Sequence, residues 1–275
     1  MTRKYSGLTA LTAALVLSAC GGGGGDSGSG NTGVGNTLPA VHAPTLPVAV
    51  PTQPTVTASA EGVYEGSLSG GLSHVSLVTD SNRLYSMIGA TTGGVFGISR
   101  FLEGVGASNN GSFTATDVRE YGVTPSTVVG TFAGTYVPAA SLTGILTMGS
   151  TSTALTGTAL ANMNYVYNTA AKLANITGAW TLRDLSGATV ALTVAADGTF
   201  TGNAGACAMK GSLTPHASGK NLFIFALVAG AAPCPRPDEV TTGVAIEFKV
   251  DVMRQLIAAG SNVTRVNGTA WVGAR

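Results

Sequence analysis

The sequence contains few charged residues, few histidines and few cysteines. Of its 275 residues only 10% are charged, with 14 basic and 13 acidic side chains, and it has three histidines and three cysteines. A protein that binds nucleic acid neutralises phosphates with an excess of Lys and Arg, and this chain has no such excess. We therefore expect no nucleic-acid partner.

Motifs for catalysis and for cofactors are also missing. No G-x-S-x-G elbow is present, because the sequence around Ser99 lacks the second glycine. His42, His74 and His216 lie far apart in the chain, and none accompanies an obvious nucleophile. The glycine tract after Cys20 is not followed by the Lys-Ser/Thr pair of a phosphate-binding loop. We expect a non-catalytic protein with no cofactor and no metal site.

Long apolar runs are absent except at the start of the chain. Arg3 and Lys4 precede an uncharged, mostly apolar stretch over residues 7–19, which is the pattern of an export signal and is too short for a comfortable transmembrane helix. The stretch ends in Leu-Ser-Ala-Cys at Cys20, which resembles the lipobox of bacterial lipoproteins. The resemblance implies cleavage after residue 19, lipidation of the Cys20 sulfur and acylation of its new amino terminus. The alternative is an ordinary signal peptide with an incidental cysteine.

The segment after the cysteine has the composition of a linker. Residues 20–59 are rich in Gly and Ser and then in Pro, with almost no large apolar side chain, so they cannot form a core. We predict a flexible, disordered tether here. Gly21 occupies the position at which an aspartate is the inner-membrane retention signal, so the outer membrane is the expected location.

The remaining residues have the periodicity of β-strands. Short spans alternate apolar and polar residues and are separated by Gly, Asn, Asp and Pro turns. This pattern predicts an all-β, antiparallel fold of sandwich or barrel type. We expect a first β unit over residues 60–166, a short connector with helical character over 167–175, and a second β unit over 176–275.

The beginnings of the two units resemble each other at an offset of 115 to 117 residues. This similarity indicates one supersecondary unit used twice, and an open sheet in either unit would find its nearest cover in the other. We therefore expect an interface between the units near the connector. Coincidence between two glycine-rich sequences is the alternative. The matched pairs are Tyr64 with Trp180, Gly70 with Gly187, Leu77 with Leu192, and Tyr85 with Phe200.

Two cysteines, Cys207 and Cys234, remain in the second unit after lipidation of Cys20. An exported chain lies in an oxidising compartment, so we predict a disulfide that fixes a proline-rich loop to a strand. A zinc site would require closely spaced pairs of Cys or His, which are missing.

Charged residues are concentrated in two short segments, "DVREY" and "PRPDE". We consider both as candidate recognition loops, with an ordinary solvated loop as the alternative. The candidate residues are Asp117, Arg119, Glu120 and Tyr121 in the first segment, and Arg236, Asp238 and Glu239 in the second.

The second unit also resembles a known group of proteins. The run from Asp197 to Ile246, with two cysteines and a Gly-Lys-Asn turn, followed by the sequence from Arg254 to the end, is similar to uncharacterised lipoproteins of β-proteobacteria. The resemblance implies a β-rich, disulfide-bonded lipoprotein and implies no activity.

The sequence leaves two main functional hypotheses. The first is an outer-membrane-anchored lipoprotein whose β-rich body binds a protein, a glycan or a small apolar ligand, while its lipid holds it to the membrane. The second is a periplasm-facing lipoprotein with a structural or envelope-assembly role. Exposure at the cell surface would distinguish them, and an enzyme is the least favoured reading.

Overall fold

The computed structural model describes residues 58–275, apart from residues 94, 125–127 and 161–164. The predicted signal peptide, Cys20 and all but the last two residues of the predicted tether lie outside the described residues. The described chain is almost entirely antiparallel β-structure with one short helix, α1. Within it, no helix has the length and apolar character needed to cross a membrane.

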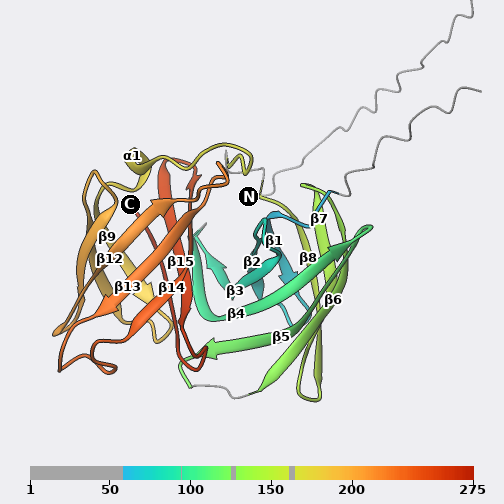
Figure 1. Ribbon diagram of the computed structural model, residues 1–275, viewed down its shortest axis with the longest axis horizontal. Helices are drawn as coiled ribbons and strands as arrows, with labels where there is room; N and C mark the ends of the chain where they lie inside the picture. The colour runs from blue at the N-terminus through green and yellow to red at the C-terminus, as the bar shows by residue number, and fades with distance from the viewer. Residues whose placement is uncertain (1–57, 94, 125–127, 161–164) are drawn as a thin grey trace, which may run out of the picture. The chain divides into compact units, whose positions relative to one another are not determined.

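The first half of the described chain forms a closed eight-stranded barrel (Figure 1). Each strand is antiparallel to the next, and β1 also pairs with β8 to close the sheet. The strands are Gly62–Leu68 (β1), Ser73–Val78 (β2), Arg83–Thr92 (β3), Val95–Asn109 (β4), Ser112–Gly122 (β5), Val129–Val137 (β6), Ser141–Met148 (β7) and Thr151–Ala159 (β8).

The second half repeats this topology in a second closed barrel, in which β9 pairs with both β10 and β16. The predicted all-β fold of two tandem antiparallel units is therefore confirmed, and both units are barrels. The strands are Gly178–Asp184 (β9), Thr189–Val194 (β10), Thr199–Ala204 (β11), Cys207–Pro215 (β12), Phe223–Ala229 (β13), Val240–Val250 (β14), Met253–Asn262 (β15) and Gly268–Ala274 (β16).

Alternating side chains divide each barrel wall into an inner and an outer face. In β10, Val190, Leu192 and Val194 are buried inside the barrel while the residues between them are exposed. This burial pattern matches the alternation of apolar and polar residues in the sequence, because successive side chains of a strand point to opposite faces. The interior of the first barrel is filled in the same way by a separate cluster that includes Tyr64, Phe113 and Phe132.

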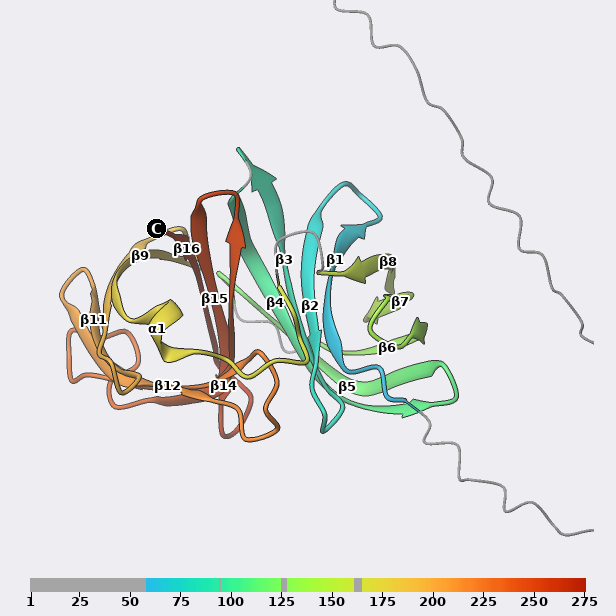
Figure 2. The ribbon, with the colours of Figure 1, turned by 90° about the horizontal axis from the view of Figure 1, so that it is seen from above.

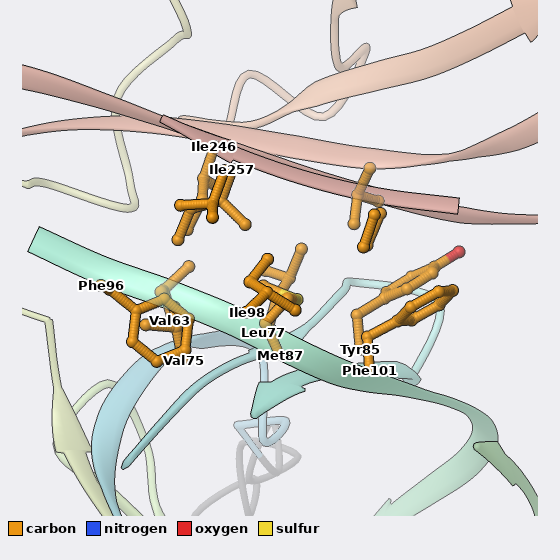
Figure 3. Packing of buried hydrophobic residues seen from close by; sticks show 14 of the residues in the cluster. Val63, Val75, Leu77, Tyr85, Met87, Phe96, Ile98, Phe101, Ile246 and Ile257 are labelled. Atoms are coloured by element: carbon orange, nitrogen blue, oxygen red, sulfur yellow. The ribbon is translucent and has the colours of Figure 1, made fainter. Parts of the chain in front are cut away.

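A third apolar cluster joins the two barrels. On the strands of the first barrel, alternate outward-facing residues such as Leu77, Met87 and Ile98 are as well buried as its interior. They pack against Ile246 of β14 and Ile257 of β15 (Figure 3). The outer faces at this contact are therefore apolar because each barrel covers the other, as expected for a shared interface. Leu160 and Tyr165, which follow β8 in the chain, also belong to the cluster.

The two barrels begin with an equivalent aromatic residue. Tyr64 in β1 donates a 2.9 Å hydrogen bond from its hydroxyl to the carbonyl of Ala60, and Trp180 in β9 donates a 2.6 Å bond from Nε1 to the carbonyl of Ile176. Each acceptor lies four residues before its donor. Tyr64 and Trp180, which are 116 residues apart, thus occupy equivalent positions in the two barrels.

The other sequence matches are out of register by one residue. Trp180 pairs across the sheet with Leu192, but Tyr64 pairs with Ser76 and not with Leu77. Leu77 consequently faces the other barrel, whereas Leu192 faces into its own barrel. Tyr85 and Phe200 differ in the same way. Matching Leu77 with Leu192 and Tyr85 with Phe200 was therefore wrong, because a slip of one residue reverses the face of a strand.

The helix α1, Leu173–Ile176, lies across one end of the second barrel (Figure 2). Its Ile176 is fully buried in the barrel interior, and Leu173 packs against the same cluster. Arg275 holds the last turn, because its guanidinium donates hydrogen bonds of 2.7 and 2.9 Å to the carbonyls of Thr177 and Asn175. This end of the barrel is closed by a few residues of the connector.

Candidate functional site

The opposite end of the second barrel contains a cavity of about 600 Å³. The turn between β9 and β10, the turn between β11 and β12, the loop between β13 and β14, and the start of β16 form its rim. Gly122 and Val123, at the end of β5, add a part of the first barrel to the lining. The cavity is thus the open mouth of a barrel that is closed at its other end.

The mouth is hollow because its inward-facing side chains are small. Ala204 in β11 and Ala229 in β13 occupy inward positions there, and Thr241 and Thr269 line the opposite side. One layer deeper, β13 and β16 carry Leu227 and Trp271, whereas β11 and β14 carry Gly202 and Gly243. Leu227 and Trp271 therefore limit the depth of the cavity on their two strands.

An aromatic ring, supported by two others, forms the floor. Trp271 lines the cavity and is 3% exposed. Its ring makes edge-to-face contacts with Phe225 at 5.2 Å and with Phe200 at 6.1 Å between centroids. Gly211 makes room for this packing, since a Cβ there would lie 2.4 Å from the Phe200 ring. The floor therefore presents a fixed apolar surface to whatever enters the mouth.

A disulfide between Cys207 and Cys234 fixes one side of the rim. Cys207 begins β12 and Cys234 lies in the loop between β13 and β14, so the bond fastens this loop to the barrel wall. Both cysteines line the cavity. The predicted disulfide is confirmed, and the structure adds that it stands at the entrance to a cavity.

The charged residues of the same loop lie at the rim. The Nε atom of Arg236 is 2.8 Å from Oε1 of Glu239, and its Nη2 donates a 3.3 Å hydrogen bond to Thr269 Oγ1. Oε2 of Glu239 accepts hydrogen bonds from the side-chain amides of Asn262 and Asn267 at 3.1 and 2.6 Å. Arg236 and Glu239 both line the cavity.

Asp238 has a different place in the loop. Its backbone is left-handed, with φ of 58°, and its side chain is not among the groups that line the cavity. Another carboxylate, Asp184 at the end of β9, does line the mouth, and its Oδ1 accepts bonds from Ser186 and the backbone N–H of Ala188.

The first candidate segment is not a loop. Asp117, Arg119, Glu120 and Tyr121 lie within strand β5, so the prediction of a loop there was wrong. Val118 faces the interior of the first barrel, and Tyr121, three residues later, faces the second barrel, so both faces of β5 are buried here. Nothing in their position brings them to the cavity, which is lined by the two residues that follow them.

Asp117 and Tyr121 instead contact the second barrel. The carboxylate of Asp117 pairs with the guanidinium of Arg265, in the turn between β15 and β16. Tyr121 is buried, stacks on Phe101 and donates a 3.0 Å hydrogen bond to the Arg265 carbonyl. Burial raises the pKa of Tyr121, and the nearby Glu103 carboxylate adds to this effect.

The other two residues of the first candidate segment, Arg119 and Glu120, pair with neighbouring side chains of the first barrel. Arg119 Nε lies 3.3 Å from an Asp117 oxygen, and Glu120 lies 3.8 Å from Arg100. Both pairs are partly exposed, and such pairs contribute about 0–1 kcal/mol.

Sequence reasoning found the disulfide and the loop that carries Arg236 but missed the cavity. Its wall residues come from several separate strands and turns and share no motif. The described residues contain no group of three or more His, Cys, Asp or Glu side chains placed to hold a metal ion.

No protein-family model matches the chain, and no curated protein matches it. A crystal structure of a protein of unknown function from the DUF3598 family of Nostoc punctiforme is similar over 78% of this chain and 94% of that chain. The sequence identity is 12% and the TM-score is 0.26. A similarity at this level carries no argument about function, which has to be argued from the cavity and its rim.

Proposed function

We propose that the protein is a lipid-anchored lipoprotein of the bacterial outer membrane whose second barrel binds a small apolar ligand and performs no catalysis. The observation that carries the binding proposal is the cavity at the barrel mouth. Ligand sites are commonly concave, mostly apolar, and about 300–1,000 Å³ in volume, with a few polar groups at fixed positions. The cavity of about 600 Å³ matches each of these properties.

The rigidity of the mouth also supports binding. The disulfide fastens the rim loop to β12, and the Phe225 and Phe200 rings pack against Trp271 at the floor. A preformed site loses little conformational entropy when it binds, so more of the contact free energy appears as affinity. A small ligand is therefore favoured over a protein or glycan partner at this position.

Binding is tested with N-phenyl-1-naphthylamine, an uncharged fluorophore whose emission rises in apolar surroundings. The test uses the full chain carrying Cys20→Ala, so that no attached lipid takes up the dye. We expect saturable binding with one site per chain and a decrease in the emission of Trp271, which lies at the floor of the cavity.

Two matched variants locate the site. Ala204→Trp places a large ring in the mouth and should weaken dye binding at least tenfold. Ala191→Trp makes the same change on the outer face of β10, where Ala191 is exposed, and should leave binding unchanged. Equal binding by both variants, or no saturable binding by the parent chain, would refute the proposed ligand site.

The membrane anchor rests on the sequence around Cys20 and has a separate test. The wild-type chain should be found in the outer-membrane fraction, and Cys20→Ala should move it to the soluble fraction or leave it unprocessed. A cleaved Cys20→Ala chain that is still retained in the membrane would contradict lipidation.

A further inference from the structure

The polar groups at the cavity rim restrict the chemistry of the ligand. This inference rests on the proposed function, because it concerns the end of the ligand that meets the rim. Three charged side chains line the cavity: Arg236, Glu239 and Asp184. They sum to one negative charge, and at the edge of an apolar cavity such a charge is poorly screened and repels an anion.

The two carboxylates are already used by the protein. Glu239 has Arg236 on one oxygen and the amides of Asn262 and Asn267 on the other. Asp184 accepts three hydrogen bonds on Oδ1 from the turn between β9 and β10, at 2.6 to 2.9 Å. Oδ2 of Asp184 has no partner within the described part of the chain, but a single free oxygen beside three bonds on Oδ1 is not a prepared cation site.

Arg236 differs from the carboxylates because it keeps a spare donor. Glu239 holds its Nε and Thr269 holds its Nη2, so the guanidinium is fixed, whereas Nη1 has no partner within the described part of the chain. The side chain is 42% exposed, which leaves this donor accessible. A fixed N–H donor at the rim of an apolar cavity suits a carbonyl or ether oxygen.

We infer that the ligand is an uncharged apolar molecule that ends in a hydrogen-bond acceptor, of the ester, amide or ketone class, and that Arg236 determines this specificity. The apolar part lies on the floor formed by Trp271, and the acceptor oxygen meets Nη1 of Arg236. The Arg236–Glu239 pair stays intact, so no charge is left unpaired.

The test is displacement of N-phenyl-1-naphthylamine at pH 7.5 by three molecules of matched size. Methyl heptanoate, octanoate and nonylammonium have the same number of non-hydrogen atoms and are neutral, negatively charged and positively charged, respectively. The ester should displace the dye at a concentration at least fivefold lower than either ion. Arg236→Leu should raise the ester concentration needed by about five- to tenfold after correction for the dye affinity of the same variant, which is measured directly.

Lys210→Leu is the control, since Lys210 is an exposed cation on β12 that does not line the cavity. It should leave displacement by the ester unchanged. Dye binding with octanoate or nonylammonium as the best competitor would overturn the inference while the proposed binding function stands. An Arg236→Leu effect no larger than that of Lys210→Leu would also overturn it. Absence of dye binding altogether would remove the proposed function and this inference with it.

Discussion

At the scale of single residues, the most unusual group is a buried histidine inside the first barrel. His74 in β2 is 1% exposed, and its Nε2 lies 3.0 Å from the carbonyl oxygen of Thr156. Because a carbonyl only accepts, Nε2 carries the proton of the neutral ring. Nδ1 then accepts from the hydroxyl of Ser76 at 2.8 Å, and Ser76 in turn accepts from Ser86 at 2.7 Å. The buried polar groups thus satisfy one another.

This arrangement predicts a loss of stability in acid. Burial lowers the pKa of His74, against the smaller opposing effect of the Thr156 hydrogen bond. The unfolded chain, with an ordinary pKa of about 6.5, therefore binds a proton more readily as the pH falls through and below that value. We expect wild type to lose more stability between pH 7.5 and pH 5 than His74→Gln does, by about 1.4 kcal/mol for each unit of pKa difference.

The measurement is the urea midpoint of both proteins at the two pH values. Glu65 lines the same small cavity as His74, and burial raises its pKa, so its protonation acts in the opposite direction. Because Glu65 is present in both proteins, its effect cancels in the comparison. An equal acid shift in wild type and variant would contradict the assignment to His74.

At the scale of elements, the disulfide between Cys207 and Cys234 should stabilise the second barrel. It closes a loop with a sequence separation of 27 residues. On the chain-entropy model a loop of this size contributes about 3.5 kcal/mol. Replacing both cysteines with serine should lower the melting temperature of the protein and weaken dye binding, because the loop between β13 and β14 at the cavity rim is then released from β12.

The control is wild type treated with a dithiol reductant, which should reproduce the change in melting temperature. A double variant that melts within two degrees of wild type would show that the disulfide adds little to the native contacts.

Element periodicity also shows how much of the fold could be predicted from the sequence. Alternation of apolar and polar residues was sufficient for the all-β class and the tandem units. It did not give the exact register, because Leu77 and Tyr85 are apolar like Leu192 and Phe200 but face the other barrel. A strand whose outer face is also buried loses its alternation, so the inner face cannot be identified from the sequence alone.

Some residues of the candidate site could also be predicted from the sequence, and others could not. Cys207, Cys234 and Arg236 could be identified because residue type and local composition mark them. The cavity depends on Ala204, Ala229 and other small side chains that meet only after the barrel closes. Asp117 and Tyr121 were misplaced because their contacts with Arg265 come from residues more than 140 positions away.

At the scale of the whole folded body, one arginine links the two barrels. Arg265 of the second barrel donates 3.0 Å hydrogen bonds to the carbonyls of Glu103 and Asp117 and pairs with the Asp117 carboxylate. Glu103 is 1% exposed and also pairs with Arg83 within the first barrel. The polar network borders an extensive apolar interface (Figure 3), so the barrels should unfold together in wild type.

Removing this link should separate the unfolding of the two barrels. Arg265→Ala removes two hydrogen bonds to carbonyls and one to a carboxylate. We expect the substitution to lower the free energy of unfolding by about 1–3 kcal/mol. Both tryptophans, Trp180 and Trp271, lie in the second barrel, so their fluorescence reports that barrel alone, while far-ultraviolet circular dichroism reports both. The two urea transitions should coincide in wild type and move apart in Arg265→Ala.

Arg254→Ala is the matched control, because Arg254 pairs with the buried Glu247 inside the second barrel at 2.5 Å. It should lower stability while the two signals stay together, since the interface is intact. Coincident transitions in Arg265→Ala would instead mean that the apolar cluster alone couples the barrels and that Arg265 contributes stability without cooperativity.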